Sequence, residues 1–194
     1  FHKAGAGGKD STVMGPVDQS IQLGDGGTGL SLEINAYRTL GHQWSLYTNL
    51  YYLANPREQN GVSTSRGGAT SATNIRYFTN TMSVPDQFMA RAGANFMTGK
   101  FSFAAGLRVE GIPSSDLIGG DKGFRRPGYI ISGEPVISYM HKKYNFYVSV
   151  PFAIERNRTK SYADKLRSTD TGSDIHGDAA FADYLINVGF SVRF

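Results

Sequence analysis

Ionisable side chains of the kinds that bind metal ions gather near the end of the sequence. In "SDIHGDAAFAD", Asp174, His176 and Asp178 stand two residues apart, so an extended backbone places all three side chains on one face. One imidazole and two carboxylates can bind a divalent cation, although structural zinc sites use four protein ligands and calcium takes six to eight oxygen ligands. These three residues are therefore candidate metal ligands, and the sequence predicts no resident cofactor.

A second polar stretch, "GIPSSDLIGGDKGFRRPG", combines glycine and proline with two acids and paired arginines. This composition is typical of an ordered loop. Arg125 and Arg126 could bind anionic groups such as phosphates through charge-assisted hydrogen bonds, and Asp116 and Asp121 are the acidic candidates of the same loop. The stretch lacks the GxxxxGK[ST] order of a phosphate-binding P-loop. A solvated surface loop is the alternative interpretation.

Charged residues also recur in segments where apolar and polar residues alternate. In the closing segment "YLINVGFSVRF", every second position from Tyr184 to Phe194 is apolar. A period of two places the intervening positions on the opposite face of an extended strand. The charged residues at such polar positions are Glu33, Arg91, Arg108, Glu110, Glu134, Glu155, Asp183 and Arg193.

The face that carries these charges permits two interpretations. The charges could line a water-filled passage and select solutes by their charge. They could instead form ion pairs that fill the interior of a narrow barrel. The number of strands decides between the two, because small barrels fill with side chains and larger ones leave a channel.

Seven alternating segments must position these side chains, and each is predicted to be a β-strand. They cover residues 30–40, 44–52, 88–96, 101–110, 129–139, 145–155 and 184–194. Pro135 and Pro151 fall inside the fifth and sixth segments. Because proline cannot donate a ladder hydrogen bond, the two prolines should mark bulges, extensions or an edge.

The connections between the segments alternate strictly in length. Three are short, around "GHQ", "TGK" and "MHKK", and three are long and polar. A soluble β-sandwich has no reason to sort its loops in this way, whereas a transmembrane β-barrel has tight turns on one side and longer loops on the other. Aromatic residues beside the short turns or at the chain end fit an interfacial girdle: Trp44, Phe96, Phe101, Tyr139, Tyr144 and Phe194.

Composition excludes several other classes. The 194 residues include 24 glycines and no cysteine, so a disulfide scaffold and a thiolate site are excluded. No apolar run is long enough for a transmembrane helix. The net charge of +4 comes from scattered basic residues, so nucleic acid is not an expected partner.

The Phe-terminated amphipathic last segment, with Tyr184, Phe190 and Phe194, resembles that of Gram-negative outer-membrane β-barrel proteins. The resemblance covers residues 30–194. It implies an all-β, antiparallel transmembrane barrel in the bacterial outer membrane, with short periplasmic turns and long extracellular loops. It also implies that the barrel-assembly machinery reads the last segment as an insertion signal, and that membrane lipid and lipopolysaccharide are partners.

Strand number yields a further expectation. If Phe194 lies at the periplasm, the segment 30–40 runs inward from the cell surface, and residues 1–29 form an extracellular loop. Single-chain bacterial barrels have even strand numbers. At least eight strands are therefore expected in the full barrel, and seven strands are not expected to close it. The alternative is that residues 13–23 form a poor eighth strand.

Function is less constrained than fold. The first hypothesis is a channel that transports small solutes, without catalysis. The second is a structural or anchoring barrel whose long loops bind other outer-membrane or surface proteins. The third is an outer-membrane hydrolase, for which the carboxylates and imidazole at 174–178 would be the candidates. Fold alone cannot choose among these functions.

Overall fold

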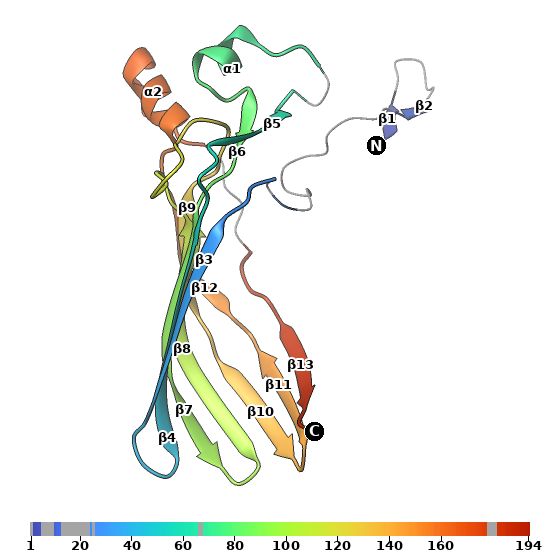
Figure 1. Cartoon of the computed structure of the whole chain (residues 1–194), viewed down its shortest axis with the longest axis vertical. Helices are drawn as coiled ribbons and strands as arrows, with labels where there is room; N and C mark the ends of the chain where they lie inside the picture. The colour runs from blue at the N-terminus through green and yellow to red at the C-terminus, as the bar shows by residue number, and fades with distance from the viewer. Residues whose placement is uncertain (1, 5–9, 13–23, 25, 66–67, 178–181) are drawn as a thin grey trace.

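The structure is a computed structural model that describes residues 2–4, 10–12, 24, 26–65, 68–177 and 182–194 (Figure 1). Its main body is a nine-stranded antiparallel sheet that curls like part of a barrel wall. The strands of this sheet are β3 (Leu30–Thr39), β4 (Trp44–Ala54), β7 (Gln87–Thr98), β8 (Phe101–Ile112), β9 (Gly128–Gly133), β10 (Val136–His141), β11 (Tyr144–Ser149), β12 (Phe152–Arg158) and β13 (Asn187–Val192). The prediction of an all-β antiparallel fold is confirmed.

Outside the large sheet, its long connections carry one short strand pair and both helices, and a second short strand pair precedes β3; the short turns lie at the opposite end of the sheet (Figure 1). The remaining elements are the strand pairs β1 (His2–Ala4) with β2 (Asp10–Thr12) and β5 (Gln59–Ser63) with β6 (Thr81–Ser83), and the helices α1 (Ala72–Arg76) and α2 (Tyr162–Thr171). Neither described helix is long and apolar enough to cross a bilayer. We call the two ends of the sheet the short-turn end and the long-loop end.

Two prolines divide what would otherwise be two long strands. Pro135 separates β9 from β10, and Pro151 separates β11 from β12. The first half of β8 pairs with β10 and its second half pairs with β9, while the Glu134 amide donates to the Gly106 carbonyl at 2.9 Å. The sequence predicted bulges, extensions or an edge at these prolines; the structure shows a break between two strands at each of them, where proline cannot donate a ladder hydrogen bond.

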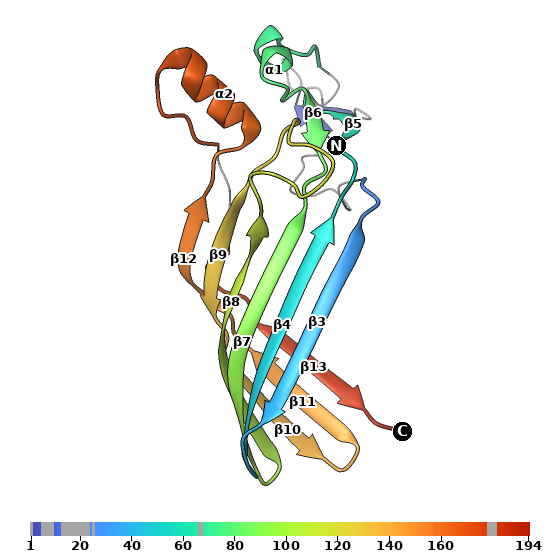
Figure 2. The same cartoon turned by 60° about the vertical axis from the view of Figure 1, so that its left-hand side comes forward.

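Along the sheet the strand order is β13-β11-β10-β8-β7-β4-β3, with β9 and β12 branching from β8 at the long-loop end (Figure 2). Near the branch, the residues just before β13 continue its pairing. Tyr184 forms an isolated antiparallel β-bridge with Phe152, and the Leu185 amide donates to the Pro151 carbonyl at 3.0 Å. Among the described residues, β3 and β13 pair with no strand on their outer sides.

Strand register sorts the side chains into two faces of opposite character. One cross-strand row contains Asn35, Asn49, Arg91, Arg108 and Ser132. The adjacent row on the other face contains Ile34, Leu50, Ala90, Val109 and Ile131. We call these the polar face and the apolar face.

Burial on the two faces is inverted relative to a water-soluble sheet. The polar side chains of Asn49 and Ser132 are each only 3% exposed, whereas Leu50 and Leu107 are 45% and 58% exposed. The less exposed face is the one expected on the inside of a curl. Among residues paired in the ladder, the charged side chains on the apolar face are Arg38, near a short turn, and Glu155, near the long loops.

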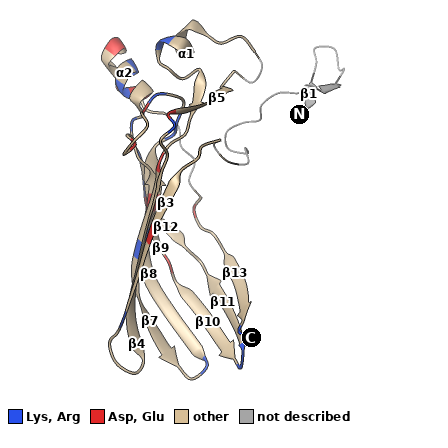
Figure 3. Cartoon of the chain, in the orientation of Figure 1, with Lys and Arg blue, Asp and Glu red and all other residues tan. Residues whose placement is uncertain are grey.

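Charge is also sparse along individual strands. Figure 3 shows that β10, β11 and β13 are uncharged along their length, and that charged residues lie in the long loops, at the short turns and at mid-height of the wall near β8 and β9. Aromatic rings pair across strands at the short-turn end of the apolar face. The rings of Trp44 and Phe96 lie 4.9 Å apart, and those of Phe101 and Tyr139 lie 5.0 Å apart. All four rings thus lie beside the short turns, while their role in an interfacial girdle stays a prediction.

A tyrosine on the polar face lies against two glycines. A Cβ added to Gly106 would lie 2.5 Å from the Tyr47 hydroxyl and 2.6 Å from the Ala92 carbonyl oxygen. We expect Gly106→Ala to lower the free energy of unfolding by about 1–3 kcal/mol, because the backbone contact cannot relax cheaply. Chemical denaturation of the two proteins measures the change. Ser102→Ala on the same face and strand serves as the control and should be nearly neutral; equal losses in both variants would contradict this packing.

Candidate functional site

The polar face begins at the sheet edge with a hydrogen-bonded carboxylate. The buried Asn49 side chain on β4 donates to Glu33 Oε1 at 2.8 Å and to Asn35 Oδ1 at 2.5 Å, both on β3. Asn35 also donates to Glu33 Oε1, at 3.0 Å. This arrangement follows from period-two alternation, which places residues 33, 35 and 49 on one face.

Ion pairs continue this polar band across the central strands. Arg91 on β7 lies 3.6 Å from Glu134, whose side chain is 7% exposed, and Arg108 on β8 lies 3.0 Å from Glu110. Within the described part of the chain, Arg91 Nε, Arg108 Nε and Glu134 Oε2 are buried without a hydrogen-bond partner. Buried polar atoms normally have such a partner, so the two arginine Nε groups can still donate, and Glu134 Oε2 can still accept, a hydrogen bond from a solute or solvent.

A cavity of about 170 Å³ lies beside these pairs, toward the long-loop end. Arg108, Glu110, Ser132 and Asp183 contribute its polar lining. The structure therefore brings Asp183 next to two of the charges predicted to share its face. The side chain of Arg193 is exposed beyond the end of β13, where its amide continues the ladder by donating to the Lys143 carbonyl at 2.9 Å.

The placement of Glu155 differs from the prediction. A β-bulge between Ala153 and Glu155 shifts the register, so that Glu155 lies opposite Ile131 on the apolar face. The next residue, Arg156, lies opposite Ile130 on the polar face and forms an ion pair with Asp183. One inserted residue reverses the face of every residue that follows, and the alternation in the sequence gave no sign of it.

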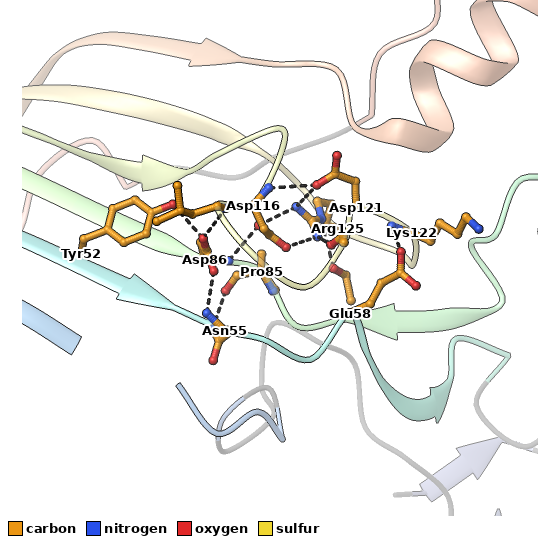
Figure 4. A network of polar contacts seen from close by, with 12 residues as sticks. Tyr52, Asn55, Glu58, Pro85, Asp86, Asp116, Asp121, Lys122 and Arg125 are labelled. Carbon is orange, nitrogen blue, oxygen red and sulfur yellow. Dashed lines mark hydrogen bonds and ion pairs between the residues drawn. The ribbon is translucent and has the colours of Figure 1, made fainter. Parts of the chain in front are cut away.

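A second cluster lies within the long loops and centres on a buried arginine (Figure 4). The Arg125 guanidinium donates to both carboxylate oxygens of Asp116, at 2.8 and 2.6 Å, and to the Gly120 carbonyl at 2.9 Å. Its Nε donates to the Ser83 hydroxyl at 3.0 Å. The arginine therefore joins the loop 113–127 to the end of β6.

Asp86 is a buried acid of this cluster that the sequence interpretation missed. It accepts hydrogen bonds from the Tyr52 hydroxyl at 2.7 Å, the Asn55 amide at 2.6 Å and the Leu117 amide at 2.8 Å (Figure 4). These donors come from β4, the start of one long loop and the middle of another. Asp86 thus fixes both loops to the wall. Because its hydrogen-bond donors are distant in sequence, no local sequence pattern predicts this role of Asp86.

The interpretation of this loop as a solvated surface needs correction. The side chains of Arg125 and Asp116 are both 0% exposed, so Arg125 is not available to an external phosphate. Their burial follows from the bidentate pair and the loops packed over it. Asp121 is half-buried and lies 3.8 Å from Arg125, whereas Arg126 is exposed with its guanidinium 5.5 Å from the Phe124 ring centre.

Burial also affects the titration of this acid. Burial raises the pKa of the Asp116 carboxyl above its ordinary value, because loss of hydration disfavours the charged form; the hydrogen bonds from Arg125 and from the Asp86 amide act in the opposite direction. A buried ion pair of this kind gives little net stability, but a single unpaired partner is costly.

Of the three candidate metal ligands near the chain end, the structure describes Asp174 and His176, and Asp174 is paired with a lysine. Asp174 forms an ion pair with Lys160, and His176 Nε2 lies 3.4 Å from Asp174 Oδ2. The hydrogen bond from Lys160 lowers the pKa of Asp174 below its ordinary value. Asp178 lies outside the described residues, and no group of three or more side chains that could hold a metal ion is found in the described ranges.

The terminal aromatics predicted to form an assembly signal are exposed. Tyr184 and Phe190 are each 63% exposed, and the Phe190 ring stacks on Phe146 of β11 at 5.7 Å between ring centres. Phe194 is fully exposed. The structure thus presents Phe190 on the apolar face, in register with its neighbour.

Comparison with known proteins adds no constraint to this geometry. No family model, no curated protein and no solved structure matches the chain. The candidate site is therefore defined by its own residues: the polar face of the curled sheet and the buried cluster of the long loops.

Proposed function

We propose that the chain forms part of the wall of an outer-membrane β-barrel and conducts small solutes along its polar face. The observation that carries the proposal is the inverted burial, with polar residues such as Asn49 on the less exposed face and leucines such as Leu107 on the open one. A barrel in lipid has this arrangement, apolar outward and polar inward.

The extent of the apolar face supports the membrane location. Side chains such as Leu32, Phe103 and Val188 are 63%, 43% and 76% exposed on strands that span the sheet. A soluble monomer rarely exposes contiguous apolar area on this scale, because transfer of such area out of water is favourable. Lipid contact removes this penalty, and the paired aromatic rings at the short-turn end suit an interfacial boundary.

Conduction is supported by the chemistry of the polar face. Charges of both signs follow one another from Glu33 through Arg91 and Arg108 to Glu134, and several of their polar atoms have hydrogen-bonding capacity left. A wall of mixed charge that faces water can pass small polar solutes and discriminate among ions.

Reversing one wall charge tests the channel. In Arg108→Glu, we expect planar-bilayer recordings of the assembled protein to show a shift of ion selectivity toward cations, since the new acid stands beside Glu110 and Asp183. The reversal potential in a salt gradient measures the shift. Arg126→Glu, on the exposed loop, is the matched control and should leave selectivity unchanged. A wild-type protein without conductance, or equal reversal potentials in all three proteins, would contradict conduction.

The long loops contain defined structure, which supports a second candidate function: an anchoring barrel that binds other proteins. Helix α2 begins with a capping box between Ser161 and Asp164, and Arg76 reaches it with an ion pair to Asp170 at 2.8 Å. Preformed loops lose less entropy when a partner binds. Absence of conductance would favour this role. A hydrolase is the third proposal, and among the described residues its candidate acid Asp174 is paired with Lys160.

A further inference from the structure

At the two ends of the strand path β13-β11-β10-β8-β7-β4-β3, β13 and β3 each leave one backbone edge without a strand partner in the described structure. β3 pairs only with β4, and all ten of its residues are exposed, while β13 pairs only with β11. In water such an edge can bind solvent. In lipid, every unpaired backbone group costs several kcal/mol, so both edges require strand partners.

Strand direction limits what those partners can be. The path from β3 to β13 passes through six antiparallel pairings, each of which reverses the direction of the strand. An even number of reversals leaves β3 and β13 running the same way, and Figure 2 shows both arrows pointing toward the short-turn end. These two strands therefore cannot pair antiparallel with each other.

The same argument excludes a second copy of this sheet, in the same membrane orientation, as the partner of these two edges. The copy's β3 and β13 would also run toward the short-turn end, so every contact between end strands would be parallel. Parallel strands need crossover connections, and membrane barrels of the bacterial type are antiparallel throughout.

We infer that the edges of β3 and β13 are bridged by an odd number of further strands that belong neither to residues 30–194 nor to a same-oriented second copy. The inference rests on the proposed membrane location. The strands at both contacts run from the short-turn end to the long-loop end. Each carries apolar residues toward lipid, and the one beside β3 carries polar side chains that extend the band at Glu33 and Asn35.

Adding one or two designed strands tests whether the number of bridging strands must be odd. In place of residues 1–23, one variant carries a single strand with the sequence of β4, and its matched control carries a two-strand hairpin with the sequences of β7 and β8. The single strand gives an even total and the direction that β3 and β13 both require. We expect this variant to gain the fast gel migration before heating and the protease resistance of a closed barrel. Equal behaviour of the two variants, whether both close or neither does, would overturn the inference.

Disulfide trapping gives a second test, because the natural sequence contains no cysteine. Ile34→Cys with Val188→Cys reports on contact between β3 and β13, within one chain or between copies. Leu32→Cys with Tyr52→Cys, which are register partners, is the positive control. In membranes, we expect oxidation to link the control pair and to leave the test pair unlinked. A disulfide at the test pair in membrane-inserted protein would overturn only the inference about the bridging strands. A protein that stays in the aqueous fraction would overturn both this inference and the proposed function.

Discussion

Leu107→Arg is expected to lower the free energy of unfolding in lipid vesicles by about 2–4 kcal/mol. Leu107 lies in the middle of β8 on the apolar face, in register with Ala92 and Gly133, and is 58% exposed. An arginine there would place a charge against hydrocarbon. In water, the same change at an exposed position would alter stability by only about 0.5 kcal/mol, so the two environments give clearly different results.

Denaturant titration of protein folded into vesicles measures this loss. Ser102→Arg is the matched control, since Ser102 lies on the same strand but on the polar face. Its arginine would point toward the interior of the curl and should cost much less than the one at 107. Equal stabilities of the wild type and Leu107→Arg would contradict the assignment of the apolar face to lipid.

Asp116→Ala is expected to destabilise the long-loop cluster by about 3–5 kcal/mol, because it leaves the buried Arg125 guanidinium without its carboxylate. The change also removes the acceptor for the Asp86 amide, which donates to Asp116 at 3.0 Å. Protease cleavage within residues 113–127 and hydrogen exchange of the amides of residues 83, 86 and 117 would both report the loss.

A double variant separates the loss of the ion pair from the cost of the remaining charge. Asp116→Leu with Arg125→Met should recover a large part of the stability lost in Asp116→Ala, since apolar side chains of similar volume often replace a buried ion pair without net loss. Arg126→Met, at the exposed neighbouring arginine, is the control and should be nearly neutral. If the double variant is as unstable as Asp116→Ala, hydrogen bonds to the loop backbone would outweigh the unpaired charge.

The strands could be predicted from sequence because their signal is local. Alternation placed Asn49 and Leu50 on opposite faces, and Pro135 and Pro151 indicated where the ladder breaks. One signal was overlooked: Ser161 followed three residues later by Asp164 begins α2 as a capping box. Such a pattern predicts a helix start without any tertiary information.

The remaining features depend on contacts that a linear pattern does not encode. The bulge before Glu155 is a property of the pairing between β12 and β9, so alternation alone assigned that residue to the wrong face. Arg125 looked like a solvent-facing arginine because its partners, Asp116 and Ser83, converge only after the long loops have folded over one another. Asp86 was missed for the same reason.

The break at Pro135 has a mechanical consequence for the wall. β8 and β10 share only four register pairs, from Phe101 to Ala104, whereas β7 and β8 share eleven. The joint between β8 and β10 has the fewest register pairs in the sheet, and because rupture force across a ladder rises with the number of bonds loaded together, we expect it to be the weakest seam. Lateral tension would therefore separate β10 from β8 first. The group of strands β10, β11 and β13 would then move away from the wall while β7 and β8 stay paired.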